Sequence, residues 1–233
     1  MADPAYVAPV DLARAPGVGG GELVLRSRPG AGRGGTDVYE LIVDGVFAMD
    51  TVEVSTELRL ASETLRRLAG TGWRVVVGGL GLGFTLRELL ADQRVATVEV
   101  VELEPALIDW VRAGLVRPAA GILDDPRVQV TTGDITAHLE SLEPASVDAI
   151  LLDVDNGPDF PVHQSNSALY EHGALATALR ALRPAGVLAI WCAGAAPGLK
   201  TALEAGARSV EEVLLAVRRE GRSFDYALYL ATQ

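Results

Sequence analysis

Residue types that could bind a ligand or move a proton recur at the ends of short apolar runs in this sequence. Glycines follow the first run, and acidic residues end or follow the next three; these residues are Gly79, Gly81, Gly83, Glu102, Asp134 and Asp153. Glycines between a strand and a helix let a ligand approach the backbone closely. A carboxylate about twenty residues further on can hold two ribose hydroxyls. This order of motifs predicts a pocket for an adenosine-containing ligand.

The glycine segment and the acid after the next strand are expected to hold the nucleoside. In the methyltransferase-like version of this turn, the backbone passes beside the amino-acid and ribose parts of a sulfonium nucleoside, and the residues expected there are Gly79, Gly81, Leu82 and Gly83. We expect Glu102 to bind the ribose, with Glu104 as the alternative. Other interpretations are a tight turn without a ligand, and acids that only favour the start of a helix through its dipole.

A Gly-Asp pair follows the third apolar run. We expect Asp134 to accept a hydrogen bond from the adenine amino group and Ile135 to meet the ring. Asp134 is equally well placed to cap the helix that follows, because a side-chain oxygen at that position accepts from a free backbone N–H. Both roles are compatible with the sequence.

The fourth apolar run ends in the acidic segment 153–159, where catalytic groups lie in open α/β sheets. Amines are protonated at neutral pH because their unperturbed pKa is roughly 10, so an attacking amine needs a base. We expect Asp153 to be that base and Asp155 to add attraction for a cation. The alternative is a polar turn of aspartates that cap the local backbone.

The loop beyond this segment is expected to cover the pocket. His163, Gln164 and Tyr170 are candidate wall residues of the substrate pocket. His138 and His172 have the pattern of ordinary helix-surface positions. No metal-ligand spacing is present, so no metal site is expected.

Strands that alternate with helices must position these residues. Apolar runs near 75, 98, 128, 147 and 187 are separated by helical segments, which indicates a mostly parallel sheet covered on both faces. The last two runs, 213–218 and 226–231, are too close for a helical crossover and predict an antiparallel hairpin. We therefore predict an α/β, Rossmann-like fold of the class I methyltransferase type, with S-adenosylmethionine or a close relative as its ligand.

The segment before this domain has a different pattern. Residues 1–21 are rich in Ala, Pro and Gly and are expected to form a flexible tail. Alternating apolar and polar residues predict a small antiparallel β appendage over 22–52, with a turn at Asp44-Gly45. The catalytic domain is expected to cover 53–233, starting with an amphipathic helix.

Composition excludes several function classes. The net charge is −11 and no basic cluster is dense enough for a nucleic-acid groove. No apolar stretch reaches about 18 residues, so no membrane span is expected. The start lacks the pattern of a signal peptide, and we expect a cytoplasmic protein. The single cysteine, Cys192, is expected to be a buried strand residue.

The motifs together resemble those of the spermidine synthases, or polyamine aminopropyltransferases. Residues 41–46 (LIVDGV) resemble the family's strand-turn-strand ending in LDGV, and residues 79–88 resemble its GGGDGG…LRE loop. Residues 102–104 (ELE) resemble its EID ribose motif, Gly133-Asp134 its GD adenine motif, and Asp153 the first acid of its DSSDP motif. The resemblance implies aminopropyl transfer from decarboxylated S-adenosylmethionine to an amine, with Asp153 binding and deprotonating the amine. It also implies a homodimer.

Leu82 departs from the family pattern and leaves the donor open. The family has an aspartate here that holds the aminopropyl ammonium of the decarboxylated donor, and a leucine cannot bind an ammonium. The DSSDP segment is likewise altered, with Asp155 as a possible substitute for its second acid. The alternatives are therefore a small-molecule methyltransferase that uses S-adenosylmethionine and a non-catalytic nucleoside-binding protein.

Overall fold

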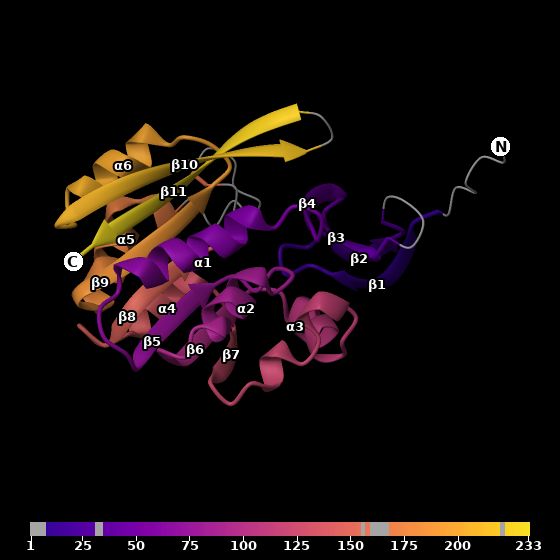
Figure 1. Ribbon diagram of the computed structural model, residues 1–233, viewed down its shortest axis with the longest axis horizontal. Helices are drawn as coiled ribbons and strands as arrows, with labels where there is room; N and C mark the ends of the chain where they lie inside the picture. The colour runs from indigo at the N-terminus through magenta and orange to yellow at the C-terminus, as the bar shows by residue number, and fades with distance from the viewer. Residues whose placement is uncertain (1–7, 31–34, 155–156, 159–167, 220–221) are drawn as a thin grey trace.

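The protein consists of a small antiparallel sheet and a larger α/β domain (Figure 1). The structure is a computed structural model, and it describes residues 8–30, 35–154, 157–158, 168–219 and 222–233. No helix among these residues is long and apolar enough to cross a membrane.

The small sheet has four strands in sequential order. Its strands are β1 (Val10–Pro16), β2 (Glu22–Arg28), β3 (Val38–Val43) and β4 (Val46–Asp50). The expected turn at Asp44-Gly45 joins β3 to β4, with positive φ at both residues, as hairpin turns of this length require. Strand β1 pairs with β2 and lies in the segment that we expected to be a flexible tail. The prediction of a tail over residues 1–21 was therefore wrong for residues 10–16.

The larger sheet has seven strands in the order β10-β11-β9-β8-β5-β6-β7. Their bounds are β5 (Trp73–Gly78), β6 (Val95–Glu102), β7 (Val128–Thr132), β8 (Val147–Leu152), β9 (Leu182–Cys192), β10 (Ser209–Arg219) and β11 (Arg222–Thr232). Strands β5 to β9 run parallel to one another. Strand β11 pairs antiparallel with both β9 and β10. The predicted fold class and the predicted C-terminal hairpin are therefore confirmed.

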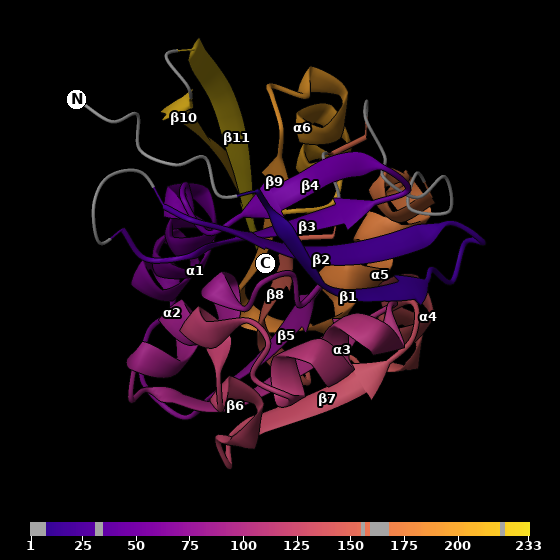
Figure 2. The ribbon, with the colours of Figure 1, turned by 90° about the vertical axis from the view of Figure 1, so that its right-hand side faces the viewer.

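Among the described residues, six α-helices cover the two faces of this sheet. They are α1 (Ser55–Arg67), α2 (Phe84–Ala91), α3 (Pro105–Arg112), α4 (Ile135–Ser141), α5 (His172–Ala181) and α6 (Pro197–Glu204), with short 3₁₀ turns at Arg117–Ala119 and Ile122–Asp124. Apolar residues of α1, α2 and α3 share one core with Val75 and Val77, while those of α4, α5 and α6 share the other with Val76. Successive residues of β5 thus point to opposite faces, as a strand buried on both sides requires. Figure 2 shows α1 and α2 on one side of the sheet and α4 and α5 on the other.

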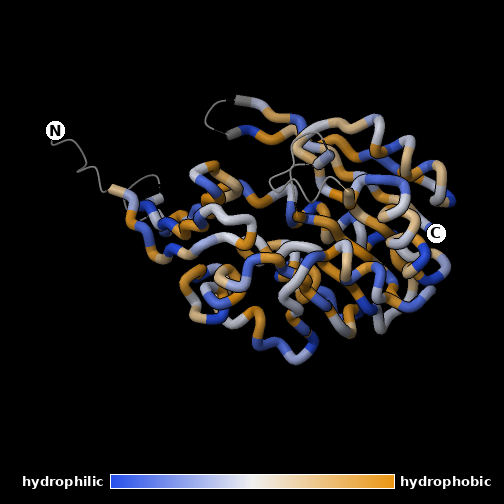
Figure 3. The backbone as a smooth tube through the Cα atoms, turned by 180° about the vertical axis from the view of Figure 1, so that it is seen from behind, coloured by the Kyte–Doolittle hydropathy of each residue, from blue (hydrophilic) through white to orange (hydrophobic). Residues whose placement is uncertain are grey.

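One helix and the start of one central strand differ from the sequence expectation. Helix α6 was not predicted, and β9 begins at Leu182 rather than 187, running through Gly186. Figure 3 shows the backbone from behind, with many of the most hydrophobic residues in the interior of the larger domain. The N-terminal part of β9 was missed because Arg183-Pro184-Ala185-Gly186 contains no apolar run.

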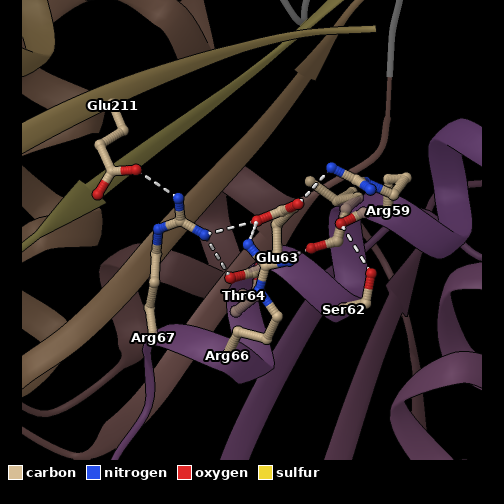
Figure 4. A network of polar contacts seen from close by, with 8 residues as sticks. Arg59, Ser62, Glu63, Thr64, Arg66, Arg67 and Glu211 are labelled. Carbon is tan, nitrogen blue, oxygen red and sulfur yellow. Dashed lines mark hydrogen bonds and ion pairs between the residues drawn. The ribbon is translucent and has the colours of Figure 1, made fainter.

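A buried carboxylate fastens α1 to the edge of the sheet (Figure 4). The Glu63 side chain is 2% exposed and pairs with Arg59 at 2.6 Å, Arg66 at 2.6 Å and Arg67 at 2.8 Å. Arg67 also pairs with Glu211 of β10. Burial on its own would raise the pKa of Glu63, but the hydrogen bond from Arg67 and the three guanidinium charges hold that pKa below its usual value.

We expect Glu63→Gln to lower the free energy of unfolding by roughly 1–3 kcal/mol near pH 7, because three guanidinium groups lose a charged acceptor. The pKa of Glu63 is depressed on folding, so this stabilisation is present above the unfolded-state pKa of about 4.3 and is lost as the pH falls through the lower folded value. Urea titrations between pH 7 and pH 3 measure it.

Glu143→Gln, on an exposed loop residue, is the control. The two variants should differ at pH 7 and converge at pH 3. Equal stability of both variants across this range would contradict a stabilising role for the network.

Candidate active site

A cavity of about 450 Å³ lies between the small sheet and the carboxyl edge of the large sheet. Its floor comes from the residues that follow β5, β6, β7 and β8, and its opposite wall from β2, β3, β4 and the start of α1. Ligands of open α/β sheets bind at this edge, where the strand order reverses. Here β5 has β6 on one side and β8 on the other, so the reversal falls at β5.

The glycine segment after β5 forms the centre of the floor. Gly79 and Gly81 line the cavity with φ of +90° and +51°, a region that side-chain-bearing residues rarely adopt. A Cβ at Gly79 would lie 2.3 Å from the carbonyl oxygen of Asp153, and one at Gly81 would lie 2.9 Å from Sδ of Met49. These glycines therefore allow the segment to pass closely between β8 and the small sheet.

Leu82 and Gly83, which we also expected beside the ligand, do not line the cavity. Leu82 is fully buried and belongs to the core beneath α1, α2 and α3. Gly83 directly precedes α2, and a Cβ there would face Ala119. The turn into α2 directs these two residues away from the cavity, so the residue expected to face the donor is instead part of the packing.

Glu102 lies at the end of β6 and is 7% exposed. One of its carboxylate oxygens accepts from the backbone N–H of Leu80 at 2.7 Å, and the other from that of Glu104 at 2.8 Å. Burial raises its pKa, partly opposed by these backbone hydrogen bonds. Glu102 thus links the glycine segment to β6 while lining the cavity, and each oxygen has a second lone pair for a ribose hydroxyl.

Glu104, the alternative ribose ligand, has a structural contact that the sequence did not reveal. Both of its carboxylate oxygens lie 3.1 Å from the backbone N of Val18, in the turn between β1 and β2. The side chain is 4% exposed. It therefore fastens the small sheet to the large domain, a role that could not be predicted while residues 1–21 were taken as a tail.

Asp134 and Ile135 lie where β7 passes into α4. The Asp134 carboxylate accepts from the backbone N–H of Thr136 at 2.6 Å, so the residue is the N-cap of α4. Asp134 and Ile135 both line the cavity as well. The capping role is therefore confirmed, and the contact with adenine stays a prediction.

Asp153 follows β8 directly and faces the cavity. Its backbone N–H donates to the carbonyl of Gly78 at 2.9 Å, and its Oδ2 accepts from the hydroxyl of Thr85 at 2.7 Å. Burial raises the pKa of Asp153, and the Thr85 hydrogen bond opposes that rise. A carboxylate with a raised pKa binds a proton more readily and suits the role of general base.

The remaining predicted site residues are Asp155, His163, Gln164 and Tyr170. Asp155, His163 and Gln164 lie outside the described residues. Tyr170 is 7% exposed and belongs to the core between the sheet and α5 rather than to the cavity lining. Tyr170 shares this core with its apolar neighbour Leu169 and with residues of α5.

The start of α1 and the C-terminal hairpin supply wall residues that sequence reasoning missed. Glu53 and Glu57 line the cavity, and Glu57 is 8% exposed with the Thr56 hydroxyl donating to it at 2.6 Å. Trp191 and Tyr226 form another part of the wall, with ring centroids 5.2 Å apart. The available signal was the acidic pair Glu53 and Glu57 at the point where the small sheet leads into α1.

The described lining of the cavity is strongly acidic. It contains no Lys, Arg or His, and its six carboxyl side chains belong to Glu53, Glu57, Glu102, Glu104, Asp134 and Asp153. Within the described residues these acids do not form a cluster with the geometry of a metal site. Such a lining favours cationic ligands and disfavours ligands that carry a carboxylate.

The parallel sheet, its antiparallel hairpin and the glycine segment beside Glu102 define an α/β protein with a fold of the class I methyltransferase type. The spermine/spermidine synthase domain matches residues 40–196, and the chain belongs to this family.

Two relatives and one solved structure indicate the range of similar proteins. A polyamine aminopropyltransferase of Mycobacterium tuberculosis is 38% identical over 157 residues, which cover 66% of this chain and 29% of that protein. Putrescine N-methyltransferase 4 of Nicotiana tabacum is 30% identical over 115 residues, or 49% of this chain and 28% of that protein. The chain thus spans about three tenths of the length of these curated relatives.

The solved structure shows the same fold. A crystal structure of spermidine synthase in complex with the transition state analogue AdoDATO superimposes with a TM-score of 0.74 at 18% identity. The superposition covers 91% of this chain and 70% of that one.

We expect Glu102→Gln to weaken binding of methylthioadenosine by about 10- to 100-fold, because a neutral amide replaces the carboxylate on the ribose and presents its NH₂ to a backbone N–H. Calorimetric titration measures the change. Glu99→Gln, on the same strand but outside the cavity lining, is the control and should bind like the wild type. Equal affinity of all three proteins would exclude Glu102 as the ribose ligand.

Proposed function

We propose that the chain is a spermidine synthase-like transferase that moves an aminopropyl group from decarboxylated S-adenosylmethionine to an amine, with Asp153 as the base. The observation that carries the proposal is Asp153 itself, held by Thr85 at the carboxyl edge of β8 and facing a cavity that the nucleoside-type glycine segment also lines. Membership of the spermine/spermidine synthase family supports it.

The acidic lining supports the decarboxylated donor. That donor carries a sulfonium and an ammonium and no carboxylate, so both charged groups attract carboxylate side chains. S-adenosylmethionine adds a carboxylate, and the described lining contains no basic side chain to receive it. Because like charges at about 4 Å repel by several kcal/mol at a protein's effective dielectric, the lining disfavours the carboxylated donor.

The chemistry assigned to Asp153 is proton removal from the acceptor. The ammonium of the acceptor binds among the acids and gives a proton to the carboxylate of Asp153. The nitrogen lone pair then attacks the aminopropyl carbon next to sulfur; a C–N bond forms, the C–S bond breaks, and neutral methylthioadenosine leaves. The protein contributes alignment, exclusion of water and the base.

Methyl transfer from S-adenosylmethionine to an amine is the second candidate. Leu82 supplies no charge for the aminopropyl ammonium, and the similarity to putrescine N-methyltransferase 4 of Nicotiana tabacum favours this candidate. A non-catalytic nucleoside-binding protein is the third candidate.

Product analysis separates these candidates. The purified protein is incubated with a panel of diamines and either donor, and products are identified by mass spectrometry. We expect methylthioadenosine and an aminopropylated amine with the decarboxylated donor. Formation of S-adenosylhomocysteine would instead establish methyl transfer, and nucleoside binding without any turnover would establish the non-catalytic candidate.

Replacement of the base gives a second test. We expect Asp153→Asn to lower kcat by about 10²- to 10⁴-fold with little change in nucleoside affinity, because the amide cannot take the amine proton. The wild-type rate should rise with pH through the raised pKa of Asp153, since the deprotonated form is active. Asp109→Asn on the exposed side of α3 is the control. An Asp153→Asn enzyme with the wild-type rate would remove Asp153 from the mechanism.

A homodimer is also proposed. Both sheets have an edge strand with exposed apolar side chains, namely Val10 and Leu12 on β1 and Leu214 on β10. Such edges are available for pairing between chains. Light scattering after size-exclusion chromatography should give twice the mass of 24.5 kDa, and a single-chain mass at micromolar concentration would contradict the proposal.

A further inference from the structure

Asp153 contacts three residues between the end of β5 and the start of α2. Its N–H bonds to the carbonyl of Gly78 at 2.9 Å, and its own carbonyl oxygen packs against Gly79, where a Cβ would lie 2.3 Å away. The third point is the side chain, whose Oδ2 accepts from Thr85 at 2.7 Å. The first two contacts fix the backbone of residue 153, and within the part of the chain that the structure describes the third fixes the orientation of its carboxylate.

Thr85 differs from three threonines that lie further inside the helices of this protein. The hydroxyls of Thr64, Thr177 and Thr201 each donate to a backbone carbonyl four residues earlier. Such bonds are the ordinary use of a threonine inside a helix. Thr85 instead donates to Asp153, which lies 68 residues further along the chain.

The position of Thr85 in α2 explains this difference. It is the second residue of the helix, which Gly83 introduces with φ of +83°. The carbonyl four residues earlier belongs to Gly81, in the cavity floor and outside the helix. The side chain is 3% exposed, so the buried hydroxyl needs a protein acceptor, and the Asp153 carboxylate supplies it.

We infer that Thr85 is the positioning residue of Asp153: its hydroxyl holds Oδ2 so that Oδ1 is the oxygen that meets the acceptor amine. This inference rests on the proposed function, because it assigns a partner to the proposed base. Thr85 touches neither the donor nor the acceptor and acts through Asp153.

Two effects of the hydroxyl follow from the geometry. It limits rotation of the carboxylate about its Cα–Cβ and Cβ–Cγ bonds, which keeps the base oriented for proton transfer. It also donates to the ionised form, which opposes the rise in the pKa of Asp153 caused by burial. Loss of the hydroxyl should therefore reduce the rate. It should also raise the pKa of Asp153, so that the rate increases only at higher pH.

Other titratable groups also face the cavity and contribute to any pH profile. They come from α1, β6, the end of β7 and β11, and are Glu53, Glu57, Glu102, Glu104, Asp134 and Tyr226. All of them are the same in every variant of Thr85, and so is the titration of the acceptor amine. The difference between the profiles of two variants therefore reports the change at Thr85 and Asp153.

The test compares Thr85→Val, which replaces the hydroxyl by a methyl group of similar size, with Thr85→Ser, which keeps the hydroxyl. We expect Thr85→Val to lower kcat/KM by about 10- to 100-fold, as for a lost hydrogen bond to a charged group. The midpoint of its pH–rate profile should move to higher pH, and nucleoside affinity by calorimetry should stay within about twofold. Thr85→Ser should restore most of the rate and the wild-type midpoint.

Thr64→Val is the matched control, because Thr64 is also fully buried on a helix but donates to a backbone carbonyl and lies outside the cavity lining. Its midpoint should not move. A Thr85→Val profile with the wild-type midpoint, or a Thr85→Ser enzyme as impaired as Thr85→Val, would overturn the inference. Asp153→Asn distinguishes failure of this inference from failure of the proposed function. If Asp153→Asn is inactive while Thr85→Val is normal, only the positioning role of Thr85 fails. An active Asp153→Asn enzyme would instead refute Asp153 as the base.

Discussion

The close passage of the glycine segment against the end of β8 is the constraint on which the candidate site depends. The carbonyl of Asp153 occupies the place that a Cβ of residue 79 would take, and the N–H of Asp153 bonds to Gly78. Any larger residue at position 79 would push β8 and β5 apart at their carboxyl ends. Since Glu102, the proposed ribose ligand, bonds to the same segment through Leu80, displacement of the segment would disturb the proposed nucleoside site and the proposed base together.

The cavity is completed by a second contact that lies far from this segment in the sequence. Glu104 holds the turn between β1 and β2 through the N–H of Val18, and this keeps the small sheet over the floor. The small sheet contributes apolar wall residues such as Leu23, Leu41 and Met49, while the acids come from α1 and the large domain. The site therefore combines an apolar wall from the small sheet with acids on the floor and near the start of α1, an arrangement that suits a ligand with an alkyl chain and terminal cations.

The sequence predicted the elements whose apolar runs are long and uninterrupted. The strands of the parallel sheet, the Asp44-Gly45 turn and the C-terminal hairpin were found, and so were the strand-end positions of Glu102, Asp134 and Asp153. Strand β1 was missed because Val10–Pro16 contains two charged residues and a proline, and its pairing with β2 is a tertiary interaction.

The cavity position of Leu82 was predicted wrongly for a different reason. Motif spacing gives the position of a residue along a turn, but the direction of its side chain depends on where the helix begins. Because α2 starts at Phe84, Leu82 points into the core, where its large apolar side chain packs without any exposed surface. An aspartate in this conformation would be a buried charge, which is costly without a partner. The leucine is thus consistent with the local packing.

The loss of an acid at position 82 does not leave the cavity without negative charge. Glu53, just before α1, and Glu57, in its first turn, bring two carboxylates to the cavity wall. Electrostatic attraction depends on the charge within a few ångströms of the ligand and not on the element that supplies it. Because these carboxylates line the cavity whatever residue occupies position 82, Leu82 argues less strongly for methyl transfer than the motif alone suggests.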